Sequence, residues 1–189
     1  MFAVPKPLAR LVPLAFAAIL GGCWISAEPL VTDRNAATVP FEGTYASSDG
    51  DDETVSILAA PSGKGYNFNQ GDESVEVHFI AIGNGWYVLQ MIDPVKEPQD
   101  IDLGPDLTGK RVPTGLANYQ LLGLSGDVIR IFKTECTEDV AALSGVEKDR
   151  NACVIEDLAS LRAAARVLAT SIVEGRTDPE VQELRPLGP

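Results

Sequence analysis

The amino-acid sequence predicts an α+β fold, in which an antiparallel β meander or small barrel-like sheet of about seven strands is covered by a C-terminal helix. Between residues 41 and 134, short segments alternate apolar and polar residues and are separated by Gly, Asn, Asp and Ser, which is typical of strands joined by tight turns. Tight turns join antiparallel neighbours, because parallel strands need long crossover connections. From residue 153 onward, apolar residues instead recur every three or four positions, which indicates a helix with one buried face.

The turn signals define the strand boundaries. Asn84-Gly85 is the strongest hairpin signal, because both residues accept the positive φ of a type I′ turn. Ser125-Gly126 marks a second hairpin. A sheet of this size either curls toward a small barrel or needs a cover on one face. The expected strands are residues 41–46, 53–60, 65–70, 74–82, 86–92, 116–124 and 127–134.

The C-terminal third supplies such a cover. We expect a short helix over residues 137–143 and a long helix over residues 153–173, with Arg162 and Arg166 to one side of its apolar stripe. The segment 177–180 has Thr at a cap position and Pro179 in a first turn, which predicts one more short helix. The stripe of the long helix comprises Ile155, Leu158, Leu161, Ala165, Leu168 and Ile172.

Composition limits the possible functions. The chain has 189 residues, which predicts one domain, and its 27 acidic against 15 basic residues give a net charge of −12. This charge argues against nucleic acid as a partner, because phosphate binding requires an excess of Lys and Arg. With one histidine and three cysteines, the chain offers few ligands for zinc or haem, and we expect no metal and no cofactor.

Residues 1–22 have the features of an export signal. Lys6 and Arg10 precede an apolar run over residues 11–20, and no acid occurs in this segment. Ten residues of helix span about 15 Å, half of a hydrocarbon core, so the run does not predict a transmembrane helix. The segment ends in Leu20-Gly21-Gly22-Cys23.

This ending resembles the lipobox of bacterial lipoprotein precursors. The resemblance implies that Cys23 carries diacylglycerol through a thioether, that the chain is cut after Gly22, and that the new amino group is acylated. Trp24, rather than Asp, follows the cysteine, which in this class favours the outer membrane, with the protein facing the periplasm. We therefore expect a membrane partner through the lipid on Cys23.

Cleavage before Cys23 defines the expected domain organisation. It removes two basic residues and no acid, which leaves a net charge of about −14, so the lipid alone would hold the chain on the membrane. Residues 23–40 mix small, polar and Pro residues, and we expect a flexible lipidated tether of about 20–25 Å. An antiparallel β domain over residues 41–134 and a helical segment over residues 135–189 follow.

Once Cys23 is assigned to the lipid, Cys136 and Cys153 remain as one pair. Exported chains oxidise such pairs, and closing this loop would stabilise the fold by roughly 3 kcal/mol in the chain-entropy model. A redox or metal role is not favoured, because the spacing is not Cys-x-x-Cys and His78 is distant in sequence. We expect a structural disulfide between the end of the last strand and the start of the long helix.

Three motifs that approach known catalytic or ion-binding patterns fail in detail. Residues 104–110 approach a phosphate-binding loop, but Arg111 stands where Ser or Thr must hold magnesium. Residues 123–127 begin like a nucleophile elbow around Ser125, yet Asp127 replaces the second glycine, and we expect His78 on the polar face of a half-exposed strand. The acids of residues 49–53 lack the spacing of an EF-hand, which favours a solvated loop. We expect no enzyme activity.

The insert over residues 93–115 is the least ordinary segment. It carries four prolines and is too long for a hairpin connection, which leaves two interpretations open, a partner-binding loop and a disordered insert.

Gly43-Thr44-Tyr45 on the first strand, followed by a meander and a late helix, resembles lipocalins, in which Trp usually occupies the place of Tyr45. The first functional hypothesis is a membrane-anchored periplasmic lipoprotein with a non-catalytic binding or scaffolding role and a possible envelope protein as partner. The alternative is a lipocalin-like carrier of a small apolar ligand. A large enclosed apolar cavity would favour the carrier, and a filled core with a clustered exposed apolar patch would favour the scaffold.

Overall fold

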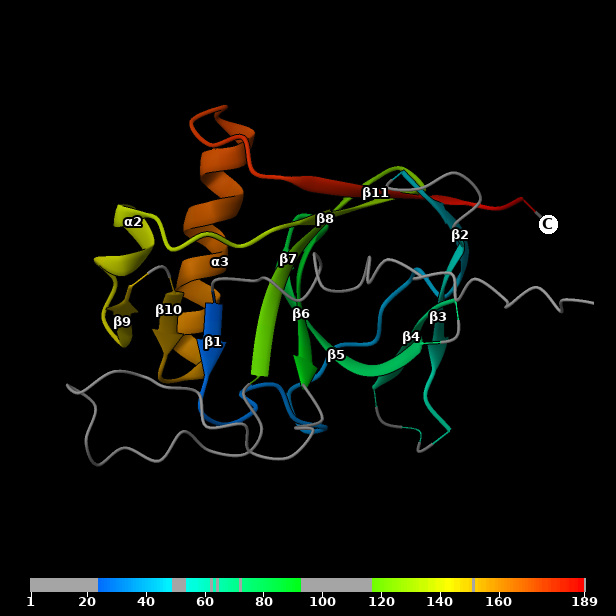
Figure 1. Cartoon of the computed structure of the whole chain (residues 1–189), viewed down its shortest axis with the longest axis horizontal. Helices are drawn as coiled ribbons and strands as arrows, with labels where there is room; N and C mark the ends of the chain where they lie inside the picture. Colours follow the sequence, from blue (N-terminus) through cyan, green and yellow to red (C-terminus); the bar gives the residue numbers. More distant parts are fainter. Residues whose placement is uncertain are drawn as a thin grey trace, which may run out of the picture.

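The chain folds into a closed antiparallel β-barrel with a helix on its outer side (Figure 1). The computed structural model describes residues 24–48, 54–61, 63, 65–71, 73–92, 117–150 and 152–188. The barrel consists of β2 (Gly43–Ser47), β3 (Thr54–Ala59), β4 (Tyr66–Gln70), β5 (Glu73–Gly83), β6 (Trp86–Ile92), β7 (Ala117–Ser125), β8 (Val128–Phe132) and β11 (Val181–Pro186). The spatial order is β6-β5-β4-β3-β2-β11-β8-β7, and β7 closes the barrel by pairing with β6.

The predicted barrel-like meander is confirmed, but the barrel has eight strands rather than seven. The eighth is β11, where the sequence predicted a short helix after Pro179. This strand inserts between β2 and β8 and pairs with both in antiparallel register. Gln182 and Leu184 point inward and are buried, while Val181 and Glu183 alternate with them on the outside. Pairing with two distant strands therefore outweighs the local capping signal of residues 177–180.

Three short strands extend the sheet beyond the barrel. They are β1 (Trp24–Ser26), β10 (Ala152–Ile155) and β9 (Val146–Asp149), and they follow one another outward from β7. β1 runs antiparallel to β7 and parallel to β10. None of the three was predicted, because strands of three or four residues are too short to show a period of two.

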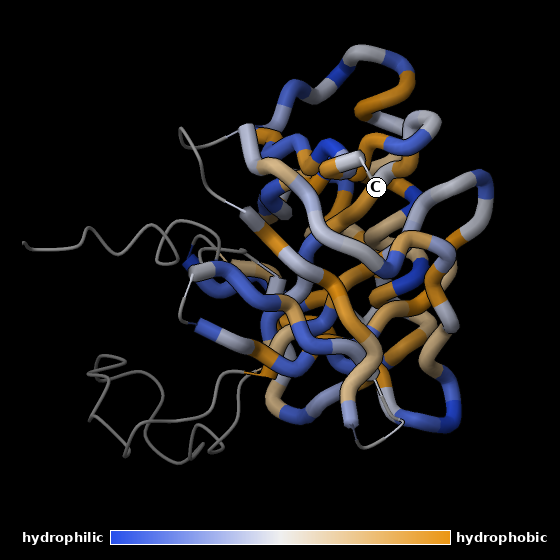
Figure 2. The backbone as a smooth tube through the Cα atoms, turned by 90° about the vertical axis from the view of Figure 1, so that its right-hand side faces the viewer, coloured by the Kyte–Doolittle hydropathy of each residue, from blue (hydrophilic) through white to orange (hydrophobic). Residues whose placement is uncertain are grey.

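The barrel interior is filled by apolar side chains. Figure 2 shows hydrophobic and hydrophilic residues alternating along the strands, as expected when one face of each strand is buried. Phe41 packs edge-to-face on both Phe79 and Tyr87, with ring centroids 5.3 Å apart in each pair. The inner core, as we call this cluster, comprises Val39, Phe41, Tyr45, Val55, Ile57, Tyr66, Phe68, Val77, Phe79, Leu89, Met91, Leu122, Ile129, Ile131 and Leu184.

A second cluster, the outer core, lies between the outside of the barrel and α3 (Leu158–Val173). Leu161, Ala164, Ala165 and Leu168 of α3 are buried there, so the predicted cover is confirmed, and the predicted stripe is confirmed from Leu158 onward, whereas its first member, Ile155, lies in a strand. Arg166 is exposed, as predicted, and Arg162 is half-buried. Ile80, Val88, Leu121 and Phe132 contribute from the barrel wall.

The helical end differs from its prediction at its start. Residues 153–155, expected in the long helix, lie in β10 (Ala152–Ile155) instead, and α3 begins after Asp157, whose side chain accepts a hydrogen bond from the Ser160 amide. Such a cap satisfies one of the amides that have no partner in the first helical turn. The short helix α2 (Glu138–Ala141) lies within the predicted range and is capped by Thr137.

The strongest hairpin prediction is confirmed. Asn84 and Gly85 have φ of 53° and 77°, the positive values of a type I′ turn, between β5 and β6.

Gly123 in β7 has a packing role. A Cβ there would lie 3.1 Å from the Trp86 ring and 3.3 Å from the Phe132 ring, so glycine allows both rings to pack on the strand.

The packing of α3 has a direct test. Leu168→Ala should lower the free energy of unfolding by about 2–5 kcal/mol, because Leu168 is 1 % exposed in the outer core. Arg166→Ala, two residues away on the exposed face, is the matched control and should change it by less than about 0.5 kcal/mol. Urea unfolding of both variants gives the comparison. Equal effects would contradict this placement of the helix.

Candidate functional site

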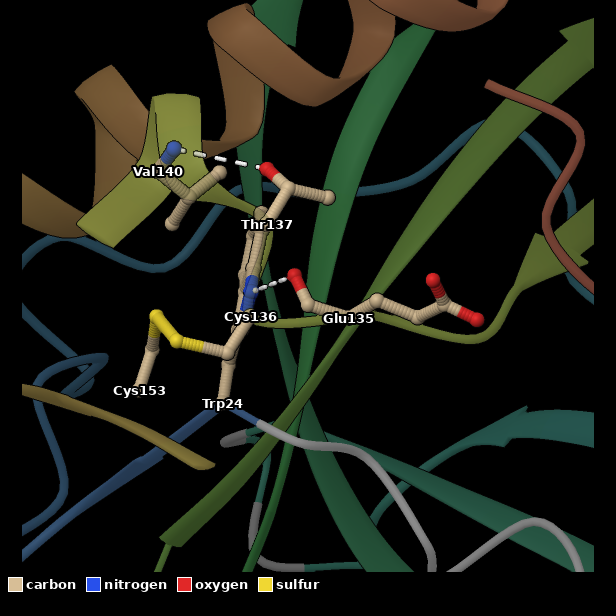
Figure 3. The surroundings of a disulfide bond; sticks show 6 residues. All are labelled: Trp24, Glu135, Cys136, Thr137, Val140 and Cys153. Atoms are coloured by element: carbon tan, nitrogen blue, oxygen red, sulfur yellow. Dashed lines mark hydrogen bonds between the residues drawn. A yellow bond between two sulfur atoms is a disulfide. The ribbon is translucent and has the colours of Figure 1, made fainter. Parts of the chain in front are cut away.

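The residue assigned to the lipid, Cys23, lies outside the described residues, but the residue that follows it, Trp24, is described. Trp24 opens β1 and is 0 % exposed. Its indole Nε1 donates to the Glu135 carbonyl oxygen at 2.9 Å, beside the disulfide (Figure 3). Its backbone pairs with Tyr119 of β7 on one side and with Cys153 of β10 on the other. The position directly after Cys23 is therefore part of the sheet.

The predicted disulfide between Cys136 and Cys153 is present, with the two Cα atoms 5.2 Å apart. The sequence predicted that this bridge would join the end of a strand to the start of a helix, and this prediction is wrong. Cys136 follows β8 and Cys153 lies in β10, so the bridge ties the chain leaving the barrel to the strand next to β1. In the chain-entropy model a loop of this length is worth roughly 3 kcal/mol.

Residues 24–41, which we call the strap, are packed against the barrel rather than forming a flexible tether (blue in Figure 1). After β1 the strap passes β7, β6 and β5 in turn. It then brings Val39 and Phe41 into the inner core and enters β2. Small and polar residues without a clear period predicted a tether, yet contacts with distant strands order this segment.

Four side chains directly opposite one another on β5, β6, β7 and β1 form what we call the cross-strand row, His78, Gln90, Tyr119 and Trp24. Directly opposite residues share one face of a sheet. Tyr119 and Trp24 belong to the outer core, so the row lies on the outside of the barrel. Gln90 and Tyr119 form hydrogen bonds with the strap, and Trp24, which belongs to the strap, donates to Glu135.

Gln90 makes the most specific contact of the row. Its Oε1 accepts from the Val31 amide and its Nε2 donates to the Val31 carbonyl, both at 2.8 Å. Gln90 is 0 % exposed and Val31 is 2 % exposed. The Gln90 carboxamide thus takes the place of a neighbouring strand, because it satisfies both the N–H and the C=O of the buried Val31.

Tyr119 binds the strap through a chain of hydrogen bonds. The Leu30 amide donates to the Tyr119 hydroxyl, which lies 2.6 Å from Ser26 Oγ. Because Ser26 Oγ donates to the Glu28 carbonyl, the phenol is the donor to Ser26. Burial raises the pKa of Tyr119 above its usual value, against the opposing effects of its hydrogen bonds with Ser26 and Leu30.

His78 is buried, at 7 % exposure, and this corrects the expectation of a half-exposed polar face. Its Nδ1 has no hydrogen-bond partner in the described part of the chain, and its Nε2 lies 3.6 Å from Glu76 Oε1. Ser125 ends β7, six residues from the point where the row of His78 crosses that strand, or about 20 Å along it. The structure therefore does not bring Ser125 and His78 together as a hydrolase pair.

One end of the barrel is lined by amides. Gln70 is the last residue of β4 and Gln182 the second of β11, and both face inward at the end where β2 and β4 finish. Gln182 Nε2 donates to Ser47 Oγ at 2.9 Å. The Oε1 atoms of Gln70 and Gln182 are buried with no hydrogen-bond partner among the described residues. Asn118 and Gln120 of β7 are also buried on inward positions near this end.

Alternation of inward positions could have revealed this amide end from the sequence. Gln70 follows Phe68 and Gln120 precedes Leu122 at the spacing of two, so each amide falls on the buried face of its strand. Buried carboxamide oxygens without partners are costly and need an explanation, and among the described residues this applies to those of Gln70 and Gln182.

A cavity of about 230 Å³ opens between the strap and the turn from β3 to β4. It is bordered by residues 36–38 of the strap, by Gly63 and Gly65, and by the Tyr66 and Phe79 side chains. Its volume is below the roughly 300–1,000 Å³ of typical small-molecule sites.

Comparison with known protein families, curated proteins and solved structures finds no match to this chain. Among the residues that the structure describes, no helix has the length and apolar character needed to cross a membrane. Within the same residues, no three His, Cys, Asp or Glu side chains gather in a group that could hold a metal ion. The loop 49–53, the stretch 104–110 and the insert 93–115 lie outside the described residues.

Two buried glutamines should respond oppositely to the same substitution. Gln90→Leu should lower the free energy of unfolding by about 2–5 kcal/mol, because it leaves the amide and carbonyl of Val31 buried without partners. Gln70→Leu should raise it by about 1 kcal/mol, because it removes a buried acceptor that has no partner among the described residues. Urea midpoints at constant m-value report both changes. A destabilising Gln70→Leu would show that its amide is satisfied in solution.

Proposed function

We propose that the chain is a lipoprotein of the bacterial cell envelope, anchored through Cys23 at the outer membrane and facing the periplasm, with a non-catalytic binding or scaffolding role. The observation that carries this proposal is the disulfide between Cys136 and Cys153, which leaves Cys23 as the cysteine available to a lipid.

The disulfide supports an exported location. Bridges of this kind persist in oxidising compartments such as the periplasm and are rare in the cytosol. Cys136 and Cys153 are the two cysteines that remain when Cys23 carries the lipid. The assignment of all three cysteines is thus consistent with one compartment.

The barrel interior supports a binding or scaffolding role over the carrier alternative. Phe41 and Phe79 help to fill the inner core and Tyr87 packs against it, and an apolar ligand would have to displace these rings. The amide end instead offers neutral acceptors to a partner that donates hydrogen bonds. Gln70 and Gln182 are therefore the described residues that we place at the binding end of the barrel.

Lipidation is tested by Cys23→Ala. We expect intact mass spectrometry of the wild type to show loss of residues 1–22 and acyl chains on Cys23. The variant should remain an unprocessed precursor and leave the detergent phase, because it lacks the thiol that takes the lipid. The paired substitution Cys136→Ser with Cys153→Ser is the control and should still be acylated. An unmodified mature N-terminus in the wild type would contradict the proposal.

A further inference from the structure

At the amide end of the barrel, the buried groups that lack partners are hydrogen-bond acceptors. Gln70 and Gln182 are each 6 % exposed, and their Oε1 atoms have no hydrogen-bond partner in the described part of the chain. Gln182 Nε2 donates to Ser47 Oγ at 2.9 Å, which fixes this carboxamide and leaves its oxygen to another donor. A ligand of this end must therefore bring N–H or O–H groups.

The ionic groups that the structure describes at this end are paired with each other. Lys133 follows β8 and Glu180 precedes β11, and Lys133 Nζ lies 3.2 Å from Glu180 Oε2. A charged ligand would gain no buried counter-charge from the described residues, and burying a charge without one is costly. The ligand that fits is neutral, like the buried carboxamides of Gln70, Asn118, Gln120 and Gln182.

The closed wall argues against a peptide and for a saccharide. An extended peptide binds by adding a strand to a free sheet edge, whereas each of the eight barrel strands has a neighbour on both sides. Gln70 and Gln182 stand on β4 and β11, which are three strand spacings apart, or at most about 14 Å. The hydroxyl groups of a sugar point outward all around its ring, so one sugar unit can donate to carboxamides on two sides of the barrel.

Resting on the binding role proposed above, we infer that the amide end binds a neutral saccharide, whose hydroxyl groups donate to Oε1 of Gln70 and to Oε1 of Gln182. Both oxygens are buried in the free protein, so the two carboxamides turn toward the sugar as it enters the end of the barrel. Each new bond satisfies an acceptor that is costly to bury alone, and this gain favours the bound state.

An NMR titration of the intact acylated protein, followed at the glutamine side-chain amides, tests this inference. The protein is kept in a zwitterionic detergent that contains no sugar. Glucose serves as the free sugar and the tetramer of N-acetylglucosamine as a piece of glycan chain. At least one of them should shift the amide signals of Gln70 and Gln182. Fully O-methylated glucose, which lacks every O–H donor, should shift neither signal.

The contribution of each carboxamide is tested by substitution. Gln70→Leu and Gln182→Leu should each raise the dissociation constant about tenfold, because each removes one acceptor. Gln70→Leu is expected above to be more stable than the wild type, so weaker binding would report the site rather than the fold. Asn69→Leu is the matched control and should bind like the wild type, because Asn69 lies on the outer face of β4 and donates to Ser56.

The outcomes separate this inference from the proposed function. Acylated, folded wild type that binds neither sugar, or that binds the O-methylated sugar equally well, would overturn the saccharide site and leave the anchor intact. Gln70→Leu that binds as tightly as the wild type would overturn the site as well. Protein that binds a sugar but carries no acyl chains by intact mass would overturn the anchor and leave the site standing.

Discussion

β5 and β7 each extend beyond the end of a neighbouring strand, and the strap supplies hydrogen-bond partners to the part of each strand that is left without one. β4 pairs with β5 only as far as Val77, and the Ala37 amide then donates to the Phe79 carbonyl at 2.7 Å. β8 pairs with β7 only from Leu121, and β1 takes the remaining edge over residues 117–119. Unpaired backbone groups in buried places are costly, so a closed wall in this sequence requires the strap.

The cross-strand row explains how the part of the strap after β1, which has no regular secondary structure, is kept in place. Gln90 supplies a donor and an acceptor where a strand would have supplied them, and Tyr119 supplies a hydroxyl that both accepts and donates. The strap then carries Phe41 into the inner core, where it joins two aromatic rings of the wall. The inner core and the outer core are therefore linked by one stretch of chain, and its first residue is the proposed neighbour of the lipid.

The sequence reveals the local features of this fold and misses the long-range ones. The hairpin at Asn84-Gly85 and the stripe of α3 are encoded by neighbouring residues, and both are confirmed. β11 is stabilised by β2 and β8, strands far away in sequence, so the local signal at Pro179 was misleading. After β1 the strap has no period, because side chains of Gln90 and Tyr119, rather than a ladder of strands, order it.

The candidate site likewise has features that the sequence predicts and features that depend on contacts between distant segments. The pairing of Cys136 with Cys153 follows from counting cysteines and is confirmed, whereas the elements they join could not be inferred without β10. The inward position of Gln70 was visible in the alternation of its strand. That its carboxamide oxygen is buried with no partner in the described part of the chain depends on the closed barrel, which no local pattern shows.

Amide hydrogen exchange of the strap tests most directly whether it is an integral part of the barrel. The amides of Val31, Ala37 and Val39 donate to Gln90, Phe79 and Tyr66, respectively. They should exchange as slowly as amides in the middle of β6 and β7, because they open only when the barrel wall opens. Exchange of these three amides at the rate of an unstructured peptide, while β6 and β7 stay protected, would contradict this account of the fold.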